Sequence, residues 1–110
     1  MGDARADALA DYLCRRAAAF SMSADVSDEQ HIARAGMALL DAAHIARELP
    51  PEDDRLTALS EAGRFETMPD RTARFVETAQ MRAAVQRPLS GESMTGSAIL
   101  DLIVETARAG

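Results

Sequence analysis

Alanine is the feature of this chain that most constrains its fold, because it fills 23 of the 110 positions. Ala has the highest helix propensity, and the aromatic residues that pleated sheets favour are limited to one Tyr and three Phe. Small side chains let helices pack closely, but each contributes little apolar area to a core. We therefore predict an all-α fold in a single domain over residues 1–110, with a thin core that a dimer interface supplements.

Apolar residues recur at helical spacing, and helix start and stop signals divide them into segments. Ser27 and Gln30 form a capping box at the start of the second helix. Pro50 and Pro51 end that helix, and Pro69 suits the first turn of a later one. The sequence thus predicts a bundle of five helices, at approximately 3–20, 28–49, 52–62, 69–87 and 95–108.

The fourth segment is expected to be a long helix, preceded by a loop over residues 64–68. Its helical wheel places Met81 and Val85 near the polar side of the helix, its polar strip. The wheel of the second segment places Met37 near its own polar strip in the same way. Such residues indicate a second contact surface. The buried face predicted for the fourth helix consists of Ala73, Val76, Ala79 and Ala83.

The fifth segment is short and almost entirely apolar. An apolar end segment of this kind normally docks in a core or in a subunit interface. Ile99, Leu102 and Ile103 are therefore candidate interface residues.

The chain contains no Lys, so Arg supplies all 12 of its basic side chains. Without Lys, Schiff-base chemistry and a P-loop lysine are excluded. Lys and Asn codons are AT-rich, and both residues are missing, which favours a GC-rich bacterial genome as the source.

Cys14 is the single cysteine, which excludes an intrachain disulfide and a Cys-based zinc cluster. Asp3 and Asp7 place acids where a signal peptide carries positive charge, and no apolar run reaches the roughly 18 residues of a membrane span. We expect a soluble cytoplasmic protein with no membrane partner and no cofactor.

Asp41, His44 and Glu48 are the sharpest candidates for chemistry, because their spacing places a carboxylate, an imidazole and a second carboxylate on one helical face. A metal site in a bundle also needs ligands from facing helices, and the other segments offer none. We therefore expect a solvated face with local ion pairs, such as Arg34 with Asp41, and no bound metal.

Neither a nucleophile nor a phosphate loop is indicated. Cys14 lies at the edge of an apolar stripe, where cysteine behaves as a small hydrophobic residue. The loop 91–96 precedes a helix, but it has no Lys and no preceding strand, and it contains Glu92. We expect no catalytic residue.

Arg71, Arg74 and Arg82 fall on one face of the predicted fourth helix. An arginine stripe can bind phosphates, but a net charge of -6 argues against direct nucleic-acid binding. The stripe suits instead an acidic surface of another protein or of a second copy, such as the first helix with Asp3, Asp7 and Asp11.

The patterns together favour a non-enzymatic module for protein-protein interaction or homodimerisation, with a regulatory role among its uses. The contact surface expected is the apolar surplus of the second and fifth helices. Two alternatives stay open: a helical protein that encloses an apolar ligand among Ala, Met and Leu side chains, and a metal-dependent protein that uses Asp41, His44 and Glu48.

Overall fold

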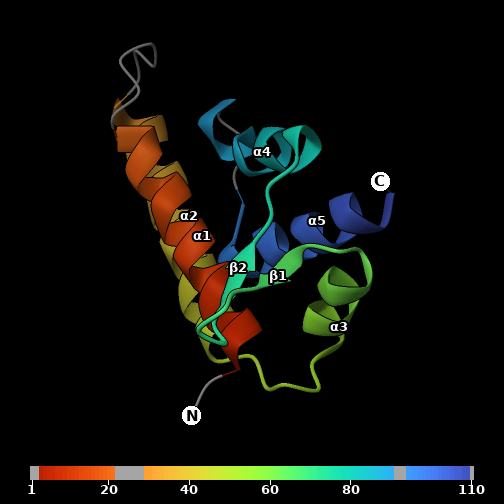
Figure 1. Cartoon of the computed structure of the whole chain (residues 1–110). Helices are drawn as coiled ribbons and strands as arrows, with labels where there is room; N and C mark the ends of the chain where they lie inside the picture. Colours follow the sequence, from red (N-terminus) through yellow and green to blue (C-terminus); the bar gives the residue numbers. More distant parts are fainter. Residues whose placement is uncertain (1–2, 22–28, 91–93, 110) are drawn as a thin grey trace.

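A computed structural model describes residues 3–21, 29–90 and 94–109 of the chain (Figure 1). The predicted all-α bundle of about five helices is confirmed in these residues as a mostly helical bundle, to which the structure adds a small antiparallel hairpin that was not predicted. Ser27 of the capping box and half of the loop 91–96, residues 91–93, lie outside the described residues. In chain order the elements are α1 (Ala4–Ser21), α2 (Glu29–Arg47), α3 (Asp54–Glu61), β1 (Phe65–Thr67), β2 (Ala73–Phe75), α4 (Ala79–Val85), the 3-10 helix η1 (Arg87–Ser90) and α5 (Gly96–Ala109).

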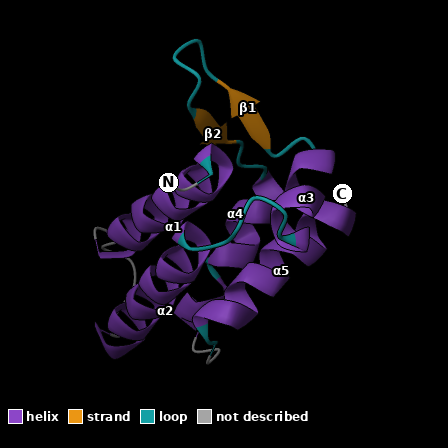
Figure 2. Cartoon of the chain, turned by 90° about the horizontal axis from the view of Figure 1, so that it is seen from below, coloured by secondary structure: helices purple, strands orange, loops and turns teal. Residues whose placement is uncertain are grey.

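Helices α1 and α2 lie side by side and run in opposite directions, and α5 packs across α2 (Figures 1 and 2). Helices α3 and α4 pack in turn on α5, while β2 contacts α1. The core between these elements holds alanines of α2 with no exposed surface, including Ala35, Ala42 and Ala46. Small side chains at these positions let the neighbouring helices approach α2 closely.

The approach is closest where α5 begins. A Cβ atom added to Gly96 would lie 2.7 Å from the backbone nitrogen of Ala42 and 2.8 Å from the carbonyl carbon of Asp41. Thr95 caps the helix by accepting a hydrogen bond of 3.1 Å from the Ala98 amide. The chain therefore enters α5 directly against the backbone of α2.

The predicted fourth helix is wrong over its first half, because residues 69–72 form the turn of a hairpin. The Asp70 carboxylate accepts hydrogen bonds from both the amide and the hydroxyl of Thr72, and Arg71 has a φ of 69°. These local bonds satisfy the backbone outside a helix. Strand β1 consequently occupies part of the predicted loop 64–68, and it pairs Phe65 with Phe75 of β2.

The helix that remains, α4, is short and faces the core differently. Thr78 caps it by accepting a bond of 3.1 Å from the Met81 amide, so the helix starts at Ala79. A helical wheel that starts at residue 69 therefore assigns the wrong residues of this helix to its buried face. Of the predicted buried face, Ala79 and Ala83 are exposed and Ala73 and Val76 are half-buried, whereas Met81, Ala84 and Val85 are buried.

Candidate functional site

An apolar groove lies on the molecular surface between α1 and α2. Its volume is about 470 Å³ and its lining carries no charged side chain. Small residues make up most of that lining, and the larger Ile32, Met37 and Leu40 project from α2 beside them. The eight residues of the groove are Cys14, Ala17, Ala18, Ile32, Ala33, Gly36, Met37 and Leu40.

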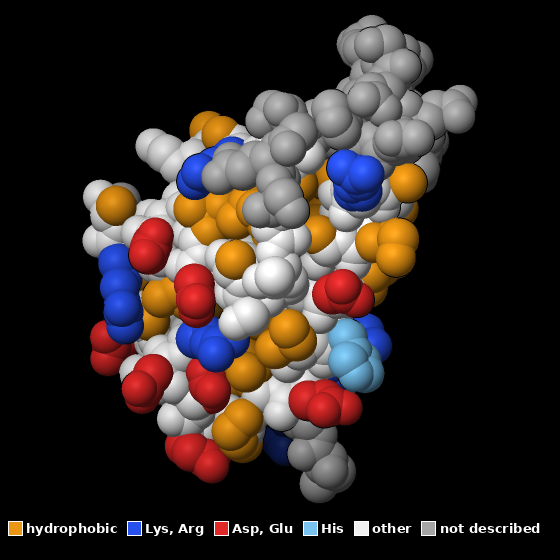
Figure 3. Space-filling view, turned by 180° about the vertical axis from the view of Figure 1, so that it is seen from behind, with side chains coloured by type: hydrophobic (Ala, Val, Ile, Leu, Met, Phe, Trp, Pro, Cys, Tyr) orange, Lys and Arg blue, Asp and Glu red, His pale blue; other side chains and the backbone are white. Residues whose placement is uncertain are grey.

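Met37 and Leu40 are exposed to an extent unusual for their type. Their exposed fractions are 66% and 51%, and they are the large apolar side chains that stand exposed among the residues whose burial the structure describes. In Figure 3, hydrophobic side chains lie along the upper right edge of the molecule, above the histidine that is drawn in pale blue. Helix α2 thus has an apolar surface on two sides, one of them buried in its own chain.

The spacing along α2 explains this second surface. Ala33, Met37, Leu40 and His44 follow one another at intervals of four, three and four residues, which keeps them on one stripe. Gly36 beside the stripe leaves open space, since no heavy atom lies within 4 Å of a Cβ added there. The exposed side chains of Met37 and Leu40 therefore project beside a groove floor made of small residues.

The metal candidates Asp41, His44 and Glu48 are all exposed; the first two lie on α2, and Glu48 lies in the turn that follows it. No three His, Cys, Asp or Glu side chains lie close enough to hold a metal ion anywhere in residues 3–21, 29–90 and 94–109, apart from the side chains that are not described. Asp41 and Glu48 lie to one side of the apolar stripe, and His44 lies at its C-terminal end.

The arginine stripe predicted on the fourth helix does not form. Arg71 lies in the hairpin turn, and Arg74 lies on β2, where it pairs with Glu66 at 2.8 Å. Arg82 lies on α4 and pairs with Glu77 at 2.7 Å. The three side chains come from three separate elements, because the hairpin replaces the first half of the predicted helix.

The apolar residues of α5 are used within the chain itself. Ile99 is 1% exposed and Ile103 has no exposed surface, while Leu102 is half-buried. The apolar surplus of α5 therefore covers the core, and the exposed surplus lies on α2. The sequence signal for that surface is Met37, which the helical wheel places near the polar strip of the second segment.

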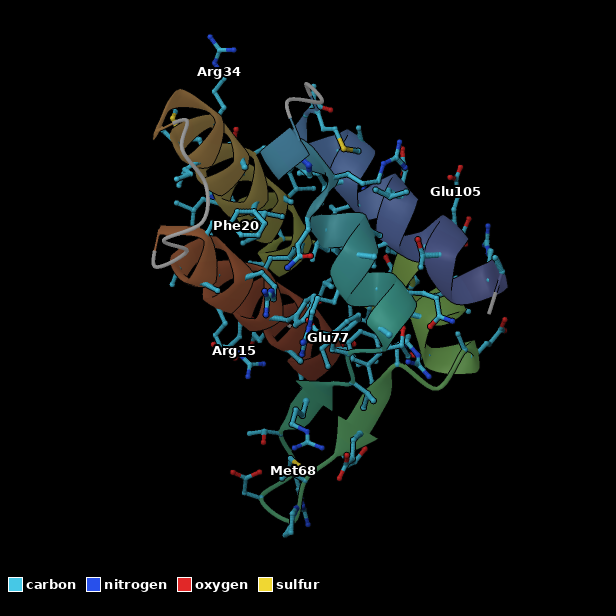
Figure 4. All side chains as sticks on the ribbon, turned by 90° about the horizontal axis from the view of Figure 1, so that it is seen from above. Arg15, Phe20, Arg34, Met68, Glu77 and Glu105 are labelled. Carbon is cyan, nitrogen blue, oxygen red and sulfur yellow. The ribbon has the colours of Figure 1, made fainter. Side chains whose placement is uncertain are left out.

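A second cluster joins α1 to the segment before α4, and sequence reasoning missed it. The Tyr12 hydroxyl donates a hydrogen bond of 2.6 Å to Glu77, whose other carboxylate oxygen accepts 2.7 Å from Arg82. Arg16 lies 3.9 Å from the same carboxylate. Figure 4 shows Glu77 where α1 and α4 approach each other.

The cluster changes the pKa of two of its members, Glu77 and Tyr12. Burial opposes the charge on Glu77, but the hydrogen bonds from Tyr12 and Arg82 and the charge of Arg16 outweigh it and hold the Glu77 pKa below its usual range. Burial, and then the hydrogen bond to Glu77, raise the pKa of Tyr12. The carboxylate already has its partners, so the cluster serves to join elements of the fold.

No protein-family model, curated protein or solved structure matches this chain. In the part of the chain that the structure describes, no helix combines the length and the apolar character needed to cross a membrane.

Proposed function

We propose that this protein is a non-enzymatic interaction module that forms a homodimer through the groove between α1 and α2. The observation that carries the proposal is the exposure of Met37 and Leu40 beside a floor of small residues. A surface that holds both the projecting side chains and the hollow is self-complementary, as a two-fold contact requires. A cytoplasmic location in a bacterial cell belongs to the same proposal and rests on the single Cys and the lack of Lys.

The energetics support association. Fully burying a Leu or Met side chain stabilises by roughly 1.5–3 kcal/mol. Met37 and Leu40 are 66% and 51% exposed, so about half to two-thirds of that gain remains for each side chain in each of the two copies. Association orders little backbone, because both side chains project from a helix that is already packed in its own chain on the opposite side. The entropy lost on binding is therefore mainly that of the side chains.

The volume of the groove also supports a second candidate, a small apolar ligand. About 470 Å³ falls within the roughly 300–1,000 Å³ typical of small-molecule sites. The groove differs from such sites in leaving two of its three large side chains, Met37 and Leu40, exposed, which favours a protein partner that covers them.

Light scattering coupled to size exclusion tests the homodimer. We expect the wild-type protein to be a dimer at tens of micromolar, and the Leu40→Glu variant to be a monomer that keeps its helical circular dichroism. Ala83→Glu is the matched control, since Ala83 is an exposed alanine on α4, away from the groove. A strictly monomeric wild-type protein, or a dimer that Leu40→Glu leaves intact, overturns the proposal. A monomer whose melting temperature rises with apolar compounds, but not after Leu40→Glu, identifies the ligand candidate instead.

A further inference from the structure

We infer that the second copy lays its α2 antiparallel along α2 of the first, so that Arg34 of each copy faces Asp41 of the other. The inference rests on the proposed homodimer and adds its orientation and the charge pair that selects it. Arg34 and Asp41 are both exposed, the ion pair expected between them does not form, and within the described residues neither has an ion-pair partner in its own chain. Figure 4 shows Arg34 pointing away from the bundle.

Helix geometry places the two charges on the same side of the apolar stripe. Arg34 follows Ala33 and Asp41 follows Leu40, so each charge stands one residue beyond a member of the stripe. Their separation of seven residues is almost two whole turns, which leaves them about 20° apart around the helix axis. The opposite side of the stripe carries Gly36 and the edge of the groove with α1.

A two-fold axis perpendicular to α2 pairs like sides of the stripe with each other. If the axis passes midway between Met37 and Leu40, Met37 meets Leu40 of the second copy, and the exposed pair becomes buried. In the same register Arg34 comes within about 3 Å, along the axis, of the level of Asp41 in the second copy. The contact thus contains two equivalent ion pairs.

A parallel arrangement gives neither Arg34 nor Asp41 a partner. It places the side of the stripe that carries these two charges against the side of Gly36 and the exposed Arg47. Arg34 meets no acid there, and Asp41 stands six residues, about 9 Å along the helix axis, from the level of Arg47. The unpaired charges of Arg34 and Asp41 therefore favour the antiparallel pairing, while the apolar stripe supplies the buried surface.

Charge reversal tests the pairing, with the dimer dissociation constant measured by sedimentation equilibrium at low salt. Arg34→Glu or Asp41→Arg alone replaces two attractions with two repulsions, so we expect each to raise the dissociation constant about tenfold. The double variant, Arg34→Glu with Asp41→Arg, restores the two pairs in reverse and should return the constant to near the wild-type value. Arg71→Glu, in the hairpin turn, makes the same charge change away from α2 and should leave it unchanged.

The outcomes separate this inference from the proposed function. A wild-type dimer that Leu40→Glu disrupts, but that the charge variants leave unchanged, overturns the antiparallel pairing and leaves the homodimer standing. Single variants that weaken the dimer without recovery in the double variant overturn the pairing in the same way. A wild-type protein that never dimerises overturns both.

Discussion

Tyr12 and Glu77 lie 65 residues apart in the chain, and their side chains meet in a hydrogen bond of 2.6 Å. Tyr12 comes from α1, and Glu77 lies in the segment between β2 and α4. The Tyr12 ring also stacks on Phe75 of β2, with the ring centroids 4.5 Å apart. One side chain of α1 therefore fixes the position of the hairpin and of the start of α4.

We predict that Tyr12→Phe lowers the free energy of unfolding by about 1.5–3 kcal/mol, the value of a hydrogen bond to a charged group. The ring and its contact with Phe75 remain, so the loss reports the hydroxyl alone. Urea denaturation measures it. Arg74→Ala is the control, because it breaks an exposed ion pair, and we expect a change below about 1 kcal/mol. Equal losses in the two variants would contradict the account of the cluster.

The same carboxylate predicts how stability depends on pH. The pKa of Glu77 is lower in the folded protein, so the folded state holds the charged form more favourably than the unfolded chain does. The contribution of Glu77 to the free energy of unfolding is complete above its pKa in the unfolded chain, about 4.3. This contribution is lost as the pH falls through the lower pKa of Glu77 in the folded protein. Urea denaturation across this range should show a smaller loss on acidification for Tyr12→Phe than for the wild-type protein. Parallel curves for the two proteins would show that Glu77 is not the group responsible.

Two helical glycines are predicted to respond in opposite ways to the same substitution. Gly96→Ala forces a Cβ against the backbone of Asp41 and Ala42, and we expect a loss of about 1–3 kcal/mol in the free energy of unfolding. Gly36→Ala meets open space inside α2, and the better helix propensity should stabilise the monomer by about 0.5–1 kcal/mol. Thermal unfolding of both variants at concentrations below dimerisation makes the comparison. A stabilising Gly96→Ala would mean that α5 does not begin against α2.

Leu40→Glu should lower the free energy of unfolding of the monomer by no more than about 1.5 kcal/mol, because only about half of the side chain is buried in its own chain. Urea denaturation in dilute solution checks this. A large loss would place Leu40 in the core and would remove the basis for using it to test the groove.

The helices could be predicted from the sequence wherever a single period runs through the whole segment. The predicted ranges 3–20 and 95–108 agree with α1 and α5 to within about a residue at each end, since their apolar stripes face one core. The hairpin could not be predicted in this way. Ala73, Val76 and Ala79 fit a helical wheel, but the side-chain bonds of Asp70 to Thr72 start a turn that periodicity does not detect.

The candidate site was partly visible in the sequence. The excess of apolar positions on the second helix indicated partners on two sides, and that helix does present a second apolar surface. Which residues form it depends on where α1 packs, and a wheel of α2 alone does not contain that information. Glu77 was missed because its partners, Tyr12 and Arg16, come from a distant part of the chain.

Cys14 allows the most direct measurement of whether a second copy covers the groove. It is the single thiol of the chain, it lines the groove, and it is partly exposed. The rate at which a soluble disulfide reagent modifies Cys14 should fall as the wild-type concentration rises through the dimer dissociation constant. In Leu40→Glu the rate should be the same at every protein concentration. A wild-type rate that does not change with protein concentration up to tens of micromolar would contradict the central claim that this groove is the surface through which the protein associates with itself.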